Sequence, residues 1–147
     1  MGFLLLEASD SRFSVFGSWF SVKSMEQKSF KSRSYRDLEV WKLSIDFVKK
    51  VYQITHNFPD SEKFGLINQI RRAAVSITSN IAEGQGRNST KEFKQFLAIS
   101  LGSLAELETQ LIIAKEIEYL TQNGLDALLS PLDRISKMIK GLSKGIA

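Results

Sequence analysis

The sequence contains no cysteine, a single histidine and only two prolines among its 147 residues. Without cysteine there can be no disulfide bond, thiolate zinc site, iron–sulfur cluster or cysteine nucleophile. His56 alone cannot supply the di-iron site of helical bundles, which needs a histidine on each of two helices. No other residue pattern is typical of a catalytic site, so we predict a protein that is not an enzyme and that holds no metal or cofactor.

Long apolar runs are also missing. No stretch approaches the roughly 18 consecutive apolar residues of a membrane-spanning helix, and the short run 3–6 is followed at once by acidic residues, unlike a secretion signal. We therefore expect a soluble, cytoplasmic protein. The 20 Lys and Arg residues against 16 Asp and Glu residues give a net charge of +4, which permits contact with nucleic acid without requiring it.

Two regions of the chain differ in pattern. Residues 1–34 are rich in serine and aromatic residues and have neither a helical nor a strand period, so we interpret them as an irregular or disordered leader. Met25 is an alternative start of translation, just ahead of the first periodic segment. A second interpretation is that the aromatic side chains of the leader dock on the rest of the protein. Residues 35–147 are expected to form one domain.

This domain has helical periodicity throughout and no alternating strand pattern, so we predict an all-α fold. The periodic segments indicate helices over about 37–57, 61–83 and 90–118, and a fourth after Thr121. Short turns between helices of this length are typical of an up-down-up-down antiparallel four-helix bundle. The expected N-caps are Asp60 or Ser61, Ser89 and Thr121.

Glycine and proline mark particular points in these helices. Gly84 is expected to end the second helix in a left-handed conformation, and Gly102 with Ser103 to mark a close helix approach in the third. Pro131 is expected to kink the fourth helix, or to restart it behind Ser130 as N-cap.

The first helix carries two apolar stripes, which together cover about half of its circumference. One consists of Leu38, Trp41, Ile45, Val48 and Tyr52, and the other of Val40, Phe47, Val51, Ile54 and Phe58. This arc is wider than a single bundle core needs.

The second helix has an apolar stripe and, opposite to it, a regular stripe of small and polar residues. The polar stripe consists of Gly65, Gln69, Arg72, Ser76, Ser79 and Glu83. A solvated face is one interpretation, but such faces usually carry long Glu and Lys side chains, so a packed polar interface is the other.

Basic residues gather around the turn between the second and third helices: Arg71, Arg72, Arg87, Lys91 and Lys94. Together with the amide groups at the start of the third helix, such a cluster suits phosphate oxygens. An ordinary solvated face is the alternative.

Several motifs appear in one order: 37–42 (DLEVWK), 58–59 (FP) with Glu62 and 65–66 (GL), 69–74 (QIRRAA), 80–84 (NIAEG) and 102–106 (GSLAE). Together they resemble the 23S rRNA intervening-sequence proteins, a four-helix bundle family whose relatives include accessory subunits of diversity-generating retroelements. The resemblance runs from about Tyr35 to Leu142. It implies a homopentameric barrel of bundles, no known catalysis and, in the retroelement branch, contacts with a reverse transcriptase and RNA.

A ring of bundles would bury the second apolar stripe of the first helix or the polar stripe of the second helix against a neighbouring protomer. Arg72 and Glu106 would then be partners across a helix or subunit boundary, because a charge placed there needs pairing. Our first hypothesis is an oligomeric nucleic-acid-binding or accessory protein that contacts RNA or DNA through Arg71, Arg87, Lys91 and Lys94. The alternative is a structural or protein-interaction module, for example a partner of a reverse transcriptase.

Overall fold

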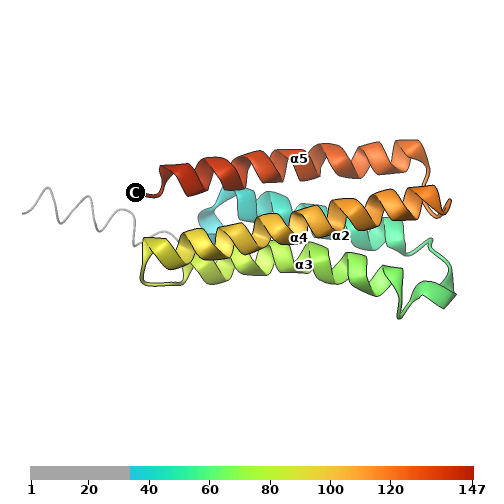
Figure 1. Ribbon diagram of the computed structural model, residues 1–147, viewed down its shortest axis with the longest axis horizontal. Helices are drawn as coiled ribbons and strands as arrows, with labels where there is room; N and C mark the ends of the chain where they lie inside the picture. The colour runs from blue at the N-terminus through green and yellow to red at the C-terminus, as the bar shows by residue number, and fades with distance from the viewer. Residues whose placement is uncertain (1–33) are drawn as a thin grey trace, which may run out of the picture. The chain divides into compact units, whose positions relative to one another are not determined.

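The computed structural model describes residues 34–147. Four long helices make up most of this segment (Figure 1): α2 (Glu39–Thr55), α3 (Leu66–Gln85), α4 (Thr90–Glu116) and α5 (Gln122–Gly145). Single turns of 3-10 helix, η1 (Tyr35–Asp37) and η2 (Asp60–Glu62), precede α2 and α3. No strand occurs between Ser34 and Ala147, so the all-α prediction is confirmed for this part of the chain. The leader predicted for residues 1–34 and the alternative start at Met25 lie outside the described residues, apart from Ser34.

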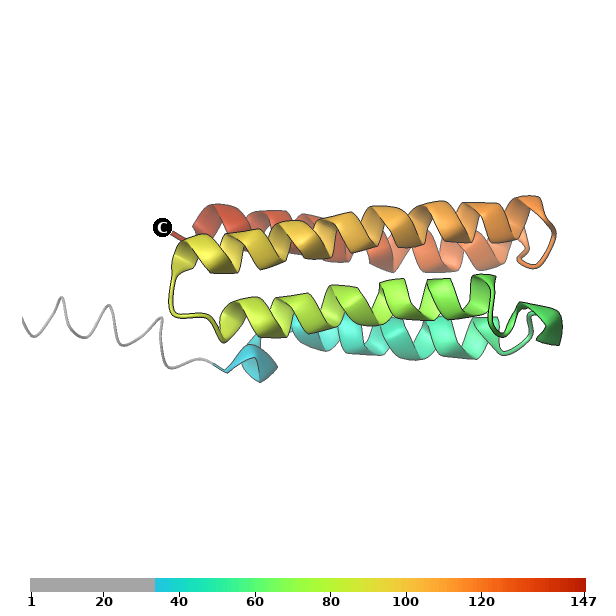
Figure 2. The ribbon, with the colours of Figure 1, turned by 60° about the horizontal axis from the view of Figure 1, so that its bottom comes forward.

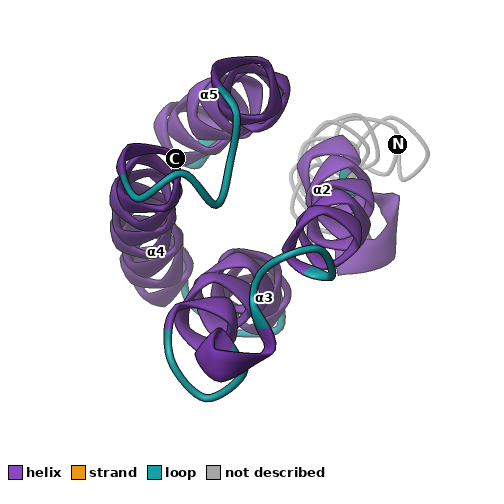
Figure 3. Cartoon of the chain, turned by 90° about the vertical axis from the view of Figure 1, so that its right-hand side faces the viewer, coloured by secondary structure: helices purple, strands orange, loops and turns teal. Residues whose placement is uncertain are grey.

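The four helices share one apolar core. Helix α2 packs against α3 and α5, and α4 packs against the same two helices, which places them around a common centre when viewed end on (Figure 3). The apolar faces of α3, α4 and α5 lie in this core, where Ile70, Ile77, Leu107, Leu128 and Ile139 are completely buried. The 3.6-residue period therefore identified the buried faces of three helices.

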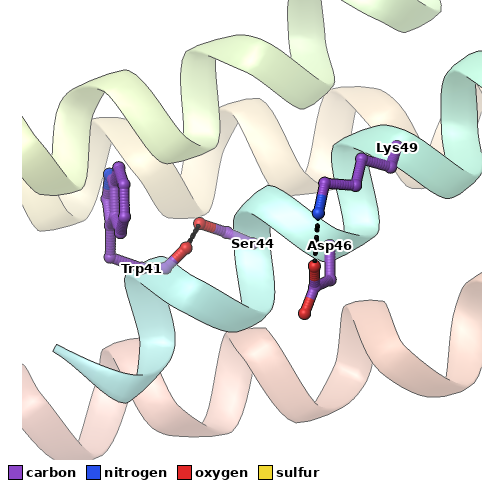
Figure 4. Close-up of polar contacts among 4 residues, drawn as sticks. All are labelled: Trp41, Ser44, Asp46 and Lys49. Atoms are coloured by element: carbon purple, nitrogen blue, oxygen red, sulfur yellow. Dashed lines mark hydrogen bonds and ion pairs between the residues drawn. The ribbon is translucent and has the colours of Figure 1, made fainter. Parts of the chain in front are cut away.

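The two stripes of α2 have different places in the structure. Val40, Phe47 and Val51, from the second stripe, are buried in the core of their own chain. The expectation that a neighbouring protomer buries this stripe is therefore wrong. Trp41 and Tyr52, from the first stripe, are partly or largely exposed. Figure 4 shows part of α2: the buried Ser44 donates its hydroxyl hydrogen to the Trp41 carbonyl over 2.7 Å, and the exposed Lys49 forms an ion pair with Asp46 over 3.0 Å.

Side-chain caps begin two of the helices as predicted. Ser89 accepts a hydrogen bond from the backbone N–H of Glu92 at the start of α4, and Thr121 accepts one from Gly124 at the start of α5. At α3 the prediction of Asp60 or Ser61 is wrong. The carboxylate of Glu62 instead accepts from the backbone N–H of Leu66 over 2.9 Å, so this cap comes from the preceding turn.

The same carboxylate ties two distant turns together. The Tyr119 hydroxyl, between α4 and α5, donates to Glu62 over 3.2 Å, and the rings of Tyr119 and Phe58 lie 5.7 Å apart. Partial removal from water raises the pKa of Tyr119, and the hydrogen bond and negative charge of Glu62 raise it further.

This contact predicts a loss of stability in alkaline solution. Because the folded state holds the Tyr119 proton more tightly than the unfolded state, its contribution is complete below about pH 10 and is lost as the pH rises through the folded-state pKa. Thermal melts between pH 9 and pH 11 should therefore show a shallower decline for Tyr119→Phe than for the wild type. Tyr35→Phe is the control, since the Tyr35 hydroxyl makes no hydrogen bond within residues 34–147. Parallel declines for all three proteins would contradict the prediction.

Two glycines have places that differ from the expected ones. Gly84 lies inside α3 and does not end it, and no described glycine has a positive φ angle. A Cβ atom at Gly84 would come within 2.7 Å of the Phe96 Cβ and 2.8 Å of the Phe93 ring, so the close approach of α3 and α4 occurs here. Gly102 faces open space, because a Cβ atom at this position would have nothing within 4 Å of it. The contact predicted for the Gly102–Ser103 pair is therefore made by Ser103, whose hydroxyl lies 2.8 Å from that of Ser76 in α3, and not by Gly102.

Proline does not divide the fourth helix. Helix α5 continues from Gln122 to Gly145 with Pro131 inside it, so the alternative of a restart behind Ser130 is wrong. Pro131 is itself half-buried, whereas Leu128 and Leu132 on either side of it are buried. The apolar seam of α5 therefore passes through the proline without interruption.

Helix α4 is apolar around most of its circumference. It is the only helix in residues 34–147 that is long and apolar enough to cross a membrane, with a mean hydropathy of 1.4 over its most apolar window. This is weak evidence for a membrane span, because the core helix of a water-soluble protein meets the same criteria. One third of that window is buried in the protein, so much of the apolar surface faces outward.

Candidate functional site

The polar stripe of α3 borders a shallow hollow beside α4. Three residues of the stripe, Gln69, Arg72 and Ser76, line this hollow of about 400 Å³ together with Asn68, Ala73 and the predicted Arg72 partner Glu106. Ser79 and Glu83 do not line it. The structure therefore brings together the residues from the first half of α3 with Glu106 of α4.

Part of the stripe is a packed seam within the chain. The hydroxyls of Ser76 and Ser103 lie 2.8 Å apart, and the side-chain amide of Asn80 donates to the Ser76 carbonyl over 2.8 Å. One turn away along α4, the buried Ser100 hydroxyl donates to the Ile77 carbonyl over 3.0 Å. These contacts join α3 to α4 and account for the small polar side chains at these positions.

Arg72 and Glu106 border the same hollow but are not joined to each other. Glu106 accepts a hydrogen bond from the Gln110 side chain over 3.0 Å. Arg72 is exposed and makes no ion pair or hydrogen bond within residues 34–147. The side chain is thus available for an anion or a carboxylate outside this part of the chain.

The predicted phosphate contacts are not all in one place. Arg71 is half-buried, donates from Nε to the Thr55 hydroxyl over 2.9 Å and lies over the Tyr52 ring at 4.5 Å. It lies 14 residues before the end of α3, about 21 Å along the helix axis from the glycine turn. Arg71 therefore joins α2 to α3 and is separate from the other basic residues.

Arg87, Lys91 and Lys94 gather around the turn between α3 and α4. Arg87 is held by Glu83 over 2.7 Å and stacks on the Phe96 ring at 4.8 Å. Lys91 and Lys94 are exposed and form no ion pair within the described segment. This turn therefore presents two unpaired ammonium groups and one arginine that is already paired.

The end of α5 adds lysines that the sequence reasoning missed. Figures 1 and 2 both place the red end of α5 at the same end of the molecule as the yellow start of α4. Lys140 and Lys144 lie on this last part of α5, exposed and without an ion pair within residues 34–147. We call Lys91, Lys94, Lys140 and Lys144 the basic end.

The other end of the helices carries mainly acidic residues. They are Asp60, Glu62, Glu108, Glu116, Glu118 and Asp126, accompanied by Lys63 and Lys115. Lys115 is paired with Glu116 over 2.9 Å. Charge is thus separated along the long axis of the helices, which favours approach of an anionic partner to the basic end.

Comparison with known proteins identifies the family. The family model described as 23S rRNA-intervening sequence protein matches residues 36–141. The chain belongs to this family. A crystal structure of a protein of unknown function from the S23 ribosomal protein family of Bacteroides thetaiotaomicron is also similar, with a TM-score of 0.65 and 26% identity, covering 71% of this chain and 98% of that chain. No curated protein matches the chain.

The motifs of this 23S rRNA-intervening sequence protein correspond to contacts in its fold. Glu62 and Gly65 form the cap of α3, where a Cβ atom at Gly65 would come within 2.5 Å of a Glu62 carboxylate oxygen. Ser103 contacts Ser76 at the α3–α4 seam. The resemblance noted in the sequence is therefore carried in part by residues that hold the helices together.

Proposed function

We propose that this 23S rRNA-intervening sequence protein is a non-enzymatic, oligomeric protein that binds nucleic acid through its basic end. The observation that carries the proposal is the group of four unpaired lysines from α4 and α5, separated from the acidic end of the helices. Exposed lysines suit phosphate groups, and the scarcity of exposed aromatic side chains beside them favours contacts to the backbone over the bases. Because the family description mentions 23S rRNA, we propose RNA as the first ligand to test.

The same proposal covers the assembly. We propose an up-down-up-down bundle, which the alternating direction of the colour gradient in Figure 1 supports, and a cytoplasmic homopentamer, as the family resemblance implies. A ring would repeat the basic end around an axis, so that weak contacts from each protomer add through effective concentration. A reverse transcriptase is a further partner that the resemblance implies.

The test is a titration of RNA and DNA binding against salt. For contacts to phosphates, the logarithm of the binding constant should fall linearly with the logarithm of the salt concentration, by about 0.7 to 0.9 for each neutralised phosphate, with little dependence on base sequence. Fluorescence anisotropy with labelled single-stranded and duplex oligonucleotides measures both quantities. Absence of binding at low salt would overturn the nucleic-acid part of the proposal.

One substitution tests the oligomer. Because Arg72 is exposed and has no partner within residues 34–147, Arg72→Ala should leave the melting temperature of the helices within a few degrees of the wild-type value. If Arg72 pairs with a carboxylate of another protomer, the same substitution should weaken assembly by about tenfold, as expected for loss of a partner to a charged group. Light scattering across a dilution series measures this. An assembly that Arg72→Ala leaves unchanged would contradict a role of Arg72 between protomers.

A structural or protein-interaction module is the second candidate function. It is supported by Arg71 and Arg87, which are both engaged with side chains of their own chain and so contribute little free charge. The two candidates differ in one observable, since a module without nucleic-acid binding would assemble normally and show no binding at low salt.

A further inference from the structure

A groove on the α2–α3 side of the protein has an apolar floor. It has a volume of about 620 Å³ and is lined by Tyr52, Ile67 and Val75, with Phe64 at its edge. Phe64 is 88% exposed, which is unusual for a phenylalanine in a helical protein because its ring gains most when it is removed from water. Within residues 34–147 only cationic groups lie over the rings of this groove, Arg71 over Tyr52 at 4.5 Å and Lys63 over Phe64 at 5.8 Å, and no apolar side chain covers Phe64.

A second apolar surface lies on the outer side of α4. Ile99, Ile113 and Ile117 are between 45% and 50% exposed. Their spacing of 14 and 4 residues places them on one side of the helix, and Gly102 between them faces open space. Ile112, although it is next to Ile113 in sequence, points about 100° away around the helix. We call Ile99, Ile113 and Ile117 the α4 ridge.

Hydrogen bonds between α3 and α4 show which residues of the two helices lie side by side, and so where the groove and the α4 ridge lie along the helix axis. Ser76 contacts Ser103, and Ser100 contacts Ile77, so residue numbers rise in opposite directions along the two helices. Counting from these pairs at 1.5 Å per residue, Phe64 is about level with residues 113–115 of α4, and Arg72 with residues 105–107. The groove therefore occupies the same stretch of the long axis as the Ile113 and Ile117 end of the α4 ridge, while Ile99 lies beyond it.

The edge of the groove and the second half of α4 carry opposite charges. The groove is edged by Lys63, Arg71 and Arg72, with no acidic residue in its lining. The second half of α4 carries Glu106, Glu108 and Glu116, with Lys115 as its one basic residue, and Glu118 follows in the turn after the helix. A copy of the chain placed at the same height would therefore bring carboxylates to the basic edge of the groove and isoleucines to its apolar floor.

We propose that the α4 ridge of one protomer docks into the Tyr52–Phe64 groove of a second copy of this chain. The groove belongs to α2 and α3 and the ridge to α4, so the contact joins two unlike surfaces, and repetition about an axis parallel to the helices closes a ring. Phe64 packs against Ile113 and Ile117, and Lys63 and Arg72 face the glutamates of α4. This inference rests on the proposed homo-oligomer and specifies which surfaces form it.

Cross-linking in the full chain tests the contact, since the sequence has no cysteine of its own. Chains carrying Phe64→Cys and chains carrying Ile113→Cys, with tags of different size, are co-expressed and treated with a short bismaleimide. The expected product is a covalent dimer of one chain of each kind. The matched control replaces Ile113→Cys by Ile112→Cys, which differs by one residue and faces another side of α4, and should give at least tenfold less of the mixed dimer.

The outcomes separate this inference from the proposed homo-oligomer. Phe64→Cys chains that cross-link to each other, or an oligomer with equal yields from Ile112→Cys and Ile113→Cys, would overturn the docking arrangement and leave the oligomer standing. A monomer by light scattering at micromolar concentration would overturn both. A second measurement applies if the cysteine variants fold poorly: Ile113→Glu should dissociate the oligomer at least tenfold more than Ile112→Glu while both keep the wild-type helical circular dichroism, and equal effects would overturn the arrangement.

Discussion

Replacing Gly84 with valine should lower the free energy of unfolding by about 3 kcal/mol, which corresponds to a fall of roughly 10 °C in melting temperature for a domain of this length. A Cβ atom at this position would lie 2.7 Å from the Phe96 Cβ, 2.8 Å from the Phe93 ring and 3.3 Å from the Phe93 carbonyl oxygen. The carbonyl belongs to the α4 backbone and cannot rotate away, so α3 and α4 must separate and their core contacts loosen.

The control for this prediction is Gly141→Val in α5. Gly141 is also a helical glycine, but nothing lies within 4 Å of a Cβ atom built there. Valine exceeds glycine in helix propensity by a few tenths of a kcal/mol, so Gly141→Val should leave stability unchanged or raise it slightly. Chemical denaturation measures both variants. Equal losses at the two glycines would show that the α3–α4 approach at Gly84 does not limit stability.

Removing three lysines of the basic end should weaken nucleic-acid binding on the order of 100-fold at low salt. The variant combines Lys91→Ala, Lys94→Ala and Lys140→Ala, whose ammonium groups have no acidic partner within residues 34–147. Each phosphate contact that is lost should reduce the slope of the salt dependence by about 0.7 to 0.9. The slope for the variant should therefore be smaller by about 2 to 3 for each protomer that contacts the ligand.

A matched variant removes the same charge from lysines that are already paired. Lys42, Lys49 and Lys137 are paired with Glu39, Asp46 and Asp133 in their own helices. Their combined replacement by alanine changes the net charge by the same amount, yet should alter affinity several-fold at most. Equal losses in the two variants would mean that overall charge alone drives binding, and an unchanged slope in an intact oligomer would place the contact surface elsewhere.

The sequence predicted the core of this protein better than its surface. Ile70, Leu107 and Ile139 follow a period of 3.6 residues, and such a period determines the buried face wherever a helix has a single apolar stripe. Helix α2 has two stripes of similar strength. The choice between Phe47 and Trp41 as the core residue depends on how α3 and α5 pack, which the sequence of α2 alone does not contain.

The same limit applies to the candidate sites. Nearness in sequence groups Arg71 with Arg87, but Arg71 bonds to Thr55 of another helix and lies far from the turn. Lys140 and Lys144 follow Lys94 by more than 40 residues and reach the same end only because α5 runs back alongside α4 to the end where α4 begins. Glu62 caps the start of α3 only because the turn before the helix brings its carboxylate to the Leu66 N–H. The spacing rules for N-cap residues do not cover such a contact.

The two hydroxyl contacts between α3 and α4 also bear on how the chain selects one alignment among several. Leucine and isoleucine recur so regularly along both helices that sliding one past the other by a turn would still bring apolar side chains together. Such a slide would separate Ser76 from Ser103 and Ser100 from the Ile77 carbonyl, leaving buried polar groups unsatisfied at about 1 to 3 kcal/mol each. Apolar contacts alone thus stabilise many alignments of these helices to a similar extent. The serine hydrogen bonds lower the free energy of one alignment relative to the others.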